Sequence, residues 1–132
     1  MIRTTHILST KKTEVIDVTP QVAELTQGVE SGLAFLYIPH TTAALILCED
    51  DEDLRADLVR VAERWLADLH PFAHIRKNNP NTEAHVLSAF GGNGITIAIE
   101  NGKLDLGTYQ NVLLLEMDGP KQRELRCKVL AG

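Results

Sequence analysis

The sequence predicts an α+β fold in which antiparallel or mixed β-sheets form a sandwich-like body beside two main helices. Apolar residues alternate over residues 95–99, as in a strand with one buried face, and Asn101-Gly102 then predicts a tight hairpin turn. Apolar residues recur at helical spacing over residues 52–69. Because strand pairs follow one another and helices are few, α+β is favoured over a regular strand–helix alternation.

The N-terminal part is predicted to contain four strands and one short helix. The strands are expected at residues 2–9, 14–18, 33–38 and 43–47. The helix is expected to start at Thr19-Pro20, with Thr19 as the N-cap and Pro20 at the first helical position. Gly28 lies near its predicted end.

The long helix begins in an acidic cluster, Asp50 to Asp53, whose charges interact favourably with a helix N-terminus. His70-Pro71 ends it, and a polar loop over residues 70–82 follows that is longer than a simple connection needs. Thr82 is expected to cap a brief helix through Leu87. A glycine-rich turn at 91–94 and the remaining strands complete the chain, with strands at 95–99, 112–115 and 123–130.

Composition indicates one globular domain over residues 1–132. The chain is 44% hydrophobic and 23% charged, which is ordinary for such a domain. No apolar run approaches the ~20 residues that span a bilayer, and the first residues lack the apolar segment of a secretory signal. We therefore expect a cytoplasmic protein without a membrane partner.

The net charge of -5 argues against nucleic acid as a partner, because nucleic-acid binding draws on clustered Lys and Arg. The basic residues near the C-terminus, Arg123, Arg126 and Lys128, are interpreted as the solvent-facing side of the last strand. Two cysteines, Cys48 and Cys127, are too few for a disulfide framework, and Cys127 is expected in the core.

Two strands, 33–38 and 112–115, are apolar on both faces although few helices are predicted to cover them. Some sheet surface is therefore expected to pack against another copy of the chain, which predicts a homo-oligomer.

Three histidines form the leading candidate site: His40 directly after an apolar strand, and His74 and His85 around the polar loop. Three imidazoles and a water are a ligand set that zinc accepts, and the metal then activates the water. The spacing matches no short zinc motif. The alternative is that these are loop and strand-end histidines bonded to the backbone.

Two carboxylates are further candidates because each lies at or within an apolar strand. Glu49 follows the strand 43–47 and serves either as a metal ligand, an acid–base group or a helix cap. Glu116 interrupts an apolar run, so its side chain either faces solvent or meets a cation. Gly107 to Gln110 offers a tight backbone turn and an amide for a ligand, or simply a β-bulge.

Five short motifs, which occur in a constant order, make the chain similar to a known protein family. They are His40 to Leu45 with Cys48-Glu49, Phe72-Ala73-His74, Ala84-His85, Glu100 to Leu104, and Gly107 to Gln110 with Glu116. Together they resemble the YjbQ-type family, small bacterial and archaeal proteins often labelled secondary thiamine-phosphate synthase. The sequence departs from the family pattern at Cys48, Ile75-Arg76 and Tyr109.

The resemblance implies a homotrimer with a cleft that contains the three histidines, within one subunit or between two. It also implies a thiamine phosphate synthase activity, the coupling of a pyrimidine pyrophosphate to a thiazole phosphate. This activity looks secondary in the family.

Two functional hypotheses follow. In the first, the chain is an enzyme: His40, His74 and His85 bind a divalent metal such as zinc, or a substrate phosphate. Glu49 is then the acid–base group, and Gln110 and Glu116 orient the ligand. Nearby cations are few, namely Arg76 and Lys77. In the second, a non-catalytic protein holds a phosphorylated small molecule or a metal in the same cleft. Metal-assisted hydrolysis is a third option.

Overall fold

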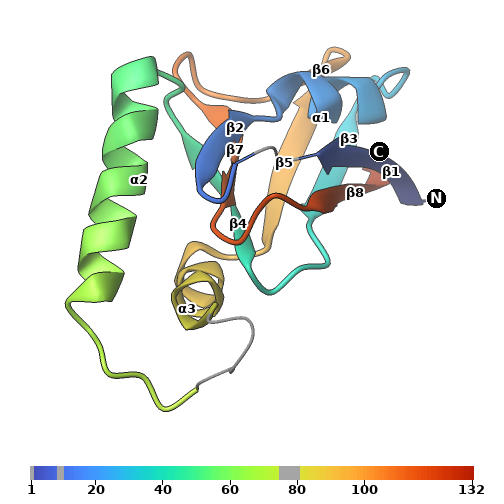
Figure 1. The fold of residues 1–132 in the computed structure, drawn as a ribbon. Coiled ribbons are helices and arrows are strands. Elements are labelled where there is room, and N and C mark those ends of the chain that lie inside the picture. Colours follow the sequence, from blue (N-terminus) through green and yellow to red (C-terminus); the bar gives the residue numbers. More distant parts are fainter. Residues whose placement is uncertain (1, 9–10, 75–80) are drawn as a thin grey trace.

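The computed structural model describes residues 2–8, 11–74 and 81–132, which form three helices and eight strands (Figure 1). Along the chain these are β1 (Ile2–Leu8), β2 (Glu14–Asp17), α1 (Thr19–Leu25), β3 (Gly32–Tyr37), β4 (Ala43–Cys48), α2 (Glu52–Ala67), α3 (Thr82–Gly91), β5 (Gly94–Glu100), β6 (Lys103–Leu104), β7 (Asn111–Glu116) and β8 (Gln122–Ala131). One sheet has the order β1-β8-β3-β5-β6 and the other β2-β7-β4, with antiparallel pairing throughout. The predicted α+β fold of antiparallel sheets is confirmed.

The main core lies between the two sheets. Alternate residues of β3, β5 and β8 point into it, and β4 and β7 supply the opposite wall. Leu36, Ile99, Leu114 and Leu125 are fully buried there. Full burial of such a side chain contributes about 1.5–3 kcal/mol, so this layer dominates the stability of the fold.

A second core lies on the other side of the small sheet, beneath α2 and α3. Ala62 and Leu66 of α2 and Leu87 of α3 pack there against Leu113 and Leu115 of β7. Strand β7 is therefore buried on both faces by its own chain. Of the two runs from which uncovered sheet surface was expected, 112–115 is therefore covered within the chain, by α2 and α3.

The helix starts differ from the prediction at α1. Val18 is the N-cap, and the Thr19 hydroxyl instead accepts a hydrogen bond from the Val112 backbone N–H at 2.9 Å, which ties α1 to β7. At α2 the acidic cluster acts as predicted: the Asp51 side chain caps the helix by accepting from the Leu54 N–H at 2.9 Å. The start of α3 differs too, because Asn81 and not Thr82 is its N-cap, and the Thr82 hydroxyl donates to the His74 carbonyl. Helix α3 continues to Gly91, beyond the predicted end at Leu87.

The hairpin between β5 and β6 is confirmed. Asn101 and Gly102 both have positive φ angles, 53° and 74°, as the tight two-residue turn requires. Cys127 is also buried as expected.

The last strand differs from its predicted orientation at Arg123. Arg123 shares the inward face of β8 with Leu125 and Cys127, and only 2% of it is exposed. The prediction that it faces solvent is wrong, because the buried carboxylate of Glu116 lies against its guanidinium. Arg126 and Lys128 lie on the outward face as predicted.

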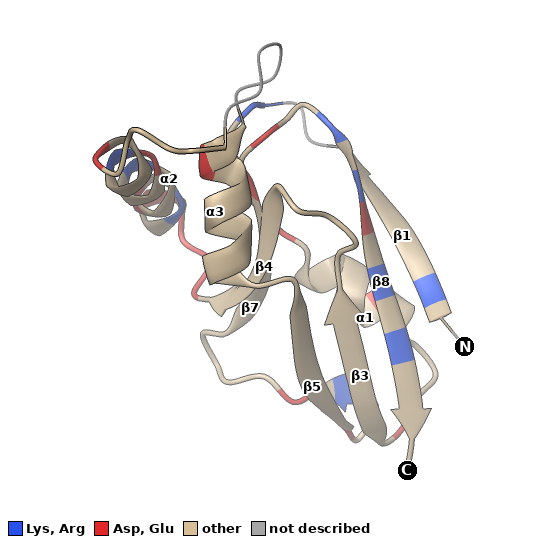
Figure 2. Cartoon of the chain, turned by 90° about the horizontal axis from the view of Figure 1, so that it is seen from below, with Lys and Arg blue, Asp and Glu red and all other residues tan. Residues whose placement is uncertain are grey.

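The outward face of the large sheet carries no cover from any described helix, since α2 and α3 lie against the small sheet (Figure 2). On it Leu33 and Phe35 of β3 remain 41% and 37% exposed, beside Leu130 of β8. Among the described residues no helix has the length and apolar character to cross a membrane.

Gly32 allows the close pairing of β3 with β8. Its φ is +151°, and a Cβ added there would lie 2.1 Å from the Leu130 carbonyl oxygen. We expect Gly32→Ala to lower the free energy of unfolding by about 2–4 kcal/mol through strain and steric overlap. Gly28→Ala is the control, because its φ is +86° but a Cβ would have open space; it should cost about 1 kcal/mol. Urea unfolding of both variants measures the difference, and equal losses would contradict the steric argument.

Candidate functional site

His40 lies in the loop that joins β3 of the large sheet to β4 of the small sheet. Its backbone carbonyl accepts a hydrogen bond from the Asn93 side chain at 2.8 Å. The same amide group lies 3.1 Å from the Ser88 hydroxyl at the end of α3. Asn93, in the connection between α3 and β5, thus holds the β3–β4 loop in place and with it the imidazole of His40.

The His40 ring has a defined hydrogen-bonding role. Its Nε2 accepts the backbone N–H of Glu124 on β8 at 2.8 Å. A neutral imidazole has one acceptor nitrogen and one N–H, so the proton lies on Nδ1. The ring therefore offers a donor, and not a lone pair, to any ligand beside it.

The pKa of His40 lies below its ordinary value of 6.5. Burial of the ring is the main cause, and the positive charge of Arg123 adds to it, while Glu124 and Glu116 act in the opposite direction. The neutral ring with its Nδ1–H is therefore the form favoured in the folded protein.

This shift predicts a pH dependence of stability. Because the unfolded chain binds the His40 proton more readily than the folded chain, the contribution of His40 is present above pH 6.5 and is lost as the pH falls through 6.5 toward the lower folded-state pKa. Urea unfolding at pH 7.5 and pH 5 should show a smaller decrease for His40→Gln than for the wild type. An equal decrease in both proteins would contradict the shift.

A pocket of about 420 Å³ opens beside this ring, and we call it the His40 pocket. It is lined by Pro39, His40, Thr41, Thr42, Asn81, His85, Lys121, Gln122 and Arg123. These residues come from the β3–β4 loop, the start of α3 and the start of β8. His40 and His85 thus meet at one pocket although 45 positions separate them.

A buried ion pair forms the base of this region. Arg123 contacts both carboxylate oxygens of Glu116, with Nε 2.7 Å from Oε1, and its Nη2 also donates to the Thr42 hydroxyl at 2.9 Å. The Asp118 backbone N–H donates to Glu116 Oε2 at 3.1 Å. Of the two interpretations of Glu116, the structure shows the one in which it meets a cation. Its bonds make it a group that positions Arg123 and Thr42.

The three predicted histidines line two neighbouring pockets. His85 shares the His40 pocket with His40, and the rings of His85 and His74 lie edge to face with centroids 5.5 Å apart. His74 itself lines a neighbouring pocket and is exposed.

The residues do not fit the predicted zinc site. No group of three or more His, Cys, Asp or Glu side chains within residues 2–8, 11–74 and 81–132 is placed to hold a metal ion. The acceptor nitrogen of His40 is also already bonded to Glu124. A metal ligand must present a free lone pair, so His40 does not qualify in this geometry.

Glu49 and Gln110 lie at the opposite end of the small sheet. In the β4–β7 pairing Ala43 is opposite Glu116, whereas Cys48 is opposite Asn111, so five residues separate the two ends, roughly 17 Å. Glu49 is exposed, and the Gln110 side chain accepts the Gly107 N–H at 2.8 Å within its own turn. Within one chain these two predicted catalytic residues are not brought to the His40 pocket.

Sequence reasoning missed several residues of the pocket. Arg123, Lys121 and Asn81 line it, and none of the three was among the candidate site residues. The sequence did contain one signal for Arg123. It lies two and four positions before Leu125 and Cys127, so in a strand its side chain lies on the same, inward face. The predicted cations Arg76 and Lys77 lie outside the described residues.

Comparison with known proteins gives a consistent result over the whole chain. A sequence profile described as UPF0047 protein YjbQ-like matches residues 3–132. A UPF0047 protein from Archaeoglobus fulgidus is 37% identical over 120 residues, which are 91% of this chain and 94% of that protein. The UPF0047 protein YugU from Bacillus subtilis is 36% identical over an alignment of 135 positions, which covers 98% of this chain and 99% of that protein.

Solved structures show the same fold. A hypothetical protein from Aeropyrum pernix superposes with a TM-score of 0.93 at 30% identity, covering 100% of this chain and 99% of that one. A YbjQ-like protein of unknown function from Sulfolobus solfataricus gives a TM-score of 0.92 at 25% identity, covering 100% and 97%.

Proposed function

Because this chain belongs to the YjbQ-like UPF0047 family, we propose that it is a small enzyme that holds the phosphate of a small phosphorylated substrate in the His40 pocket. The observation that carries this proposal is the hydrogen bond from the Glu124 N–H to His40 Nε2, which leaves Nδ1–H for the ligand. Phosphate oxygens accept hydrogen bonds, so a donor is what such a ligand requires.

The other pocket residues supply donors of the same kind. Lys121 lines the pocket, and its ammonium is oriented by Asp118 at 2.6 Å. Arg123 lies below with its charge balanced by Glu116. The pocket therefore recognises an anion through placed N–H groups more than through net positive charge.

For catalysis, the family resemblance supports a thiamine phosphate synthase activity. Pyrophosphate leaves in that reaction, and the N–H of His40 and the ammonium of Lys121 would stabilise the charge that develops on it. Glu116 would act by holding Arg123. Glu49 and Gln110 would take part only if a second copy of the chain brings them to the pocket.

Binding is tested by thermal shift and calorimetry with inorganic phosphate. We expect phosphate to raise the melting temperature of the wild type by mass action. Loss of a charged hydrogen bond should weaken binding by about 10- to 100-fold in Lys121→Ala. Lys103→Ala is the matched control, since Lys103 is an exposed lysine of β6 away from the pocket. No stabilisation of the wild type, or equal weakening by both substitutions, would contradict the proposal.

Turnover is tested separately with a pyrimidine pyrophosphate and a thiazole phosphate, by following the release of pyrophosphate. The enzyme proposal expects release that is lost in His40→Ala. Phosphate binding without release would favour the non-catalytic binding protein.

We also propose that the chain assembles as a homotrimer. The resemblance supports it, and so does the uncovered outward face of the large sheet with Leu33, Phe35 and Leu130. Sedimentation should give about three times the chain mass of 14.6 kDa. The mass of a single chain at micromolar concentration would exclude the trimer.

A further inference from the structure

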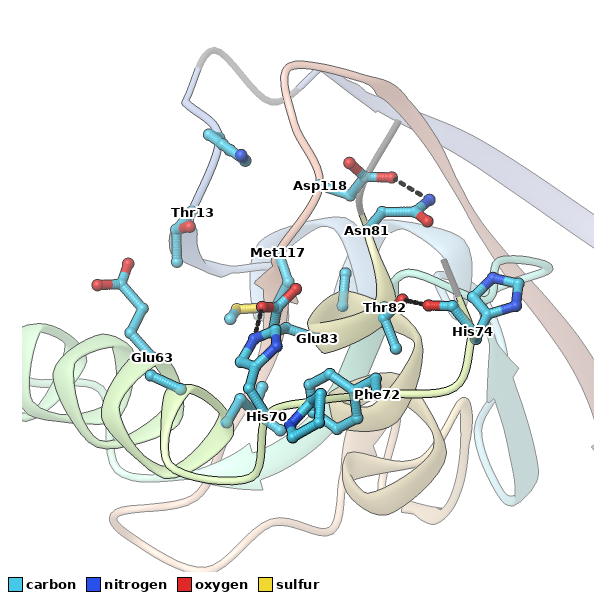
Figure 3. A pocket seen from close by; sticks show the side chains of 15 residues that line it. Thr13, Glu63, His70, Phe72, His74, Asn81, Thr82, Glu83, Met117 and Asp118 are labelled. Carbon is cyan, nitrogen blue, oxygen red and sulfur yellow. Dashed lines mark hydrogen bonds and ion pairs between the residues drawn. The ribbon is translucent and has the colours of Figure 1, made fainter. Parts of the chain in front are cut away.

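A second pocket, of about 620 Å³, lies between the end of α2 and the start of α3, and we call it the α2–α3 pocket (Figure 3). Its apolar wall consists of Leu66, Ala67, Pro71, Phe72, Ala84 and Met117. The proposed phosphate site shares only Asn81 with this pocket, whereas Phe72 and His74 of the motifs that carry the resemblance line it.

Two of the three acidic groups around this pocket are paired, and the third, Glu63, is exposed. Glu83 bonds His70, and Asp118 bonds Asn81 (Figure 3). Asp118 also bonds Lys121. Although burial raises the pKa of Asp118, the hydrogen bonds from Lys121 and Asn81 hold it below the ordinary value. The pocket offers mainly apolar surface to a ligand body, although the charged side chains of Glu63 and Lys12 also belong to its lining.

Two contacts join the α2–α3 pocket to the His40 pocket. Asn81 lines both of them. The edge-to-face contact between the His74 and His85 rings also links the pockets, because His74 lines the α2–α3 pocket and His85 lines the His40 pocket. The pockets are thus neighbours that share Asn81 in their linings.

Asn81 carries an unsatisfied polar atom at the junction of the two pockets. Its Nδ2 donates to Asp118 at 3.1 Å, but its Oδ1 is buried and has no hydrogen-bond partner among the residues that the structure describes. Buried acceptors are normally paired, and an orphan of this kind costs about 1–3 kcal/mol. Because this oxygen has almost no accessible surface, the Asn81 side chain must turn toward the junction before a ligand N–H or O–H can pair it.

We propose that one ligand occupies both pockets: its phosphate lies in the His40 pocket, and an apolar body with an N–H or O–H donor for Asn81 Oδ1 lies in the α2–α3 pocket. This inference rests on the proposed phosphate site. It assigns Asn81 and Phe72 a binding role and defines the substrate class as apolar phosphate esters with a donor group.

The test compares inorganic phosphate, phenyl phosphate and the three aminophenyl phosphates by calorimetry. Because burial of a phenyl group removes a large apolar area from water, phenyl phosphate should bind about tenfold tighter than inorganic phosphate, or more. At least one aminophenyl isomer should bind about fivefold tighter still, by pairing Asn81 Oδ1.

Variants assign the effect to the α2–α3 pocket. Phe72→Ala should remove most of the phenyl advantage and leave the affinity for inorganic phosphate unchanged. Phe90→Ala is the matched control, because Phe90 on α3 is 75% exposed and outside both pockets. Asn81→Ala should abolish the preference for the amino isomer. Melting temperatures of all variants check that they fold.

The outcomes separate the two proposals. Binding of inorganic phosphate with no gain for phenyl phosphate overturns this inference alone. A phenyl advantage that Phe72→Ala does not reduce also overturns it. Failure of every phosphate compound to bind overturns the phosphate site and, with it, this inference.

Discussion

Replacing Glu116 by Gln is expected to lower the free energy of unfolding by about 3–5 kcal/mol. The carboxylate is fully buried and bonds the Arg123 guanidinium through both oxygens. Without that negative charge, the guanidinium of Arg123, a residue that is 2% exposed, keeps its charge in the core with only neutral acceptors, namely Thr42 and the amide oxygen of the new side chain. Urea unfolding monitored by circular dichroism measures the loss.

Two further variants test whether the unpaired charge of Arg123 causes the loss of stability. Glu124→Gln removes a carboxylate from a partly exposed pair with Arg126 and should cost less than about 1 kcal/mol. The double replacement Glu116→Leu with Arg123→Met removes both charges and should recover most of the lost stability. If the double variant were as unstable as Glu116→Gln, packing and not the unpaired charge would explain the effect.

A charge placed at the centre of the outward sheet face should convert the proposed trimer to single chains. In Phe35→Asp a carboxylate replaces an aromatic ring that would be buried between copies, and an unpaired buried charge costs several kcal/mol. We expect the sedimentation mass to fall to that of one chain, while the circular dichroism spectrum stays that of the folded protein. Phe90→Asp, on α3, is the matched control and should leave the trimer intact. Retention of the trimer in Phe35→Asp would place the interface elsewhere.

Much of the fold could be predicted because its signals are local. The alternation of Ile95, Ile97 and Ile99 and the Asn101-Gly102 turn specify a hairpin within eight residues. The Asp51 cap likewise acts on a neighbour, the Leu54 N–H. The double burial of β7 was predictable as a property of the strand, but which element covers it depends on how α2 and α3 return to the sheet.

The site could be predicted only in part, because it depends on register and long-range pairing. His40 is identified by its position after an apolar strand, and His85 joins it only through the packing of α3 on β4. No local sequence pattern shows that Glu116 lies opposite Ala43 in the β4–β7 pairing, or that Gln110 lies at the other end of the small sheet. A residue such as Arg123 is assigned to solvent by default, until its buried partner is known.

The bond between β8 and His40 makes one backbone amide a natural spectroscopic probe. The Glu124 N–H points at Nε2, so its proton and nitrogen chemical shifts will follow whatever happens to that ring. Titration of acid or of a phosphate compound into nitrogen-15-labelled protein should move this single cross-peak early. An occupied pocket can thus be recognised from one assigned resonance, without a bound-state structure and without knowing the natural substrate.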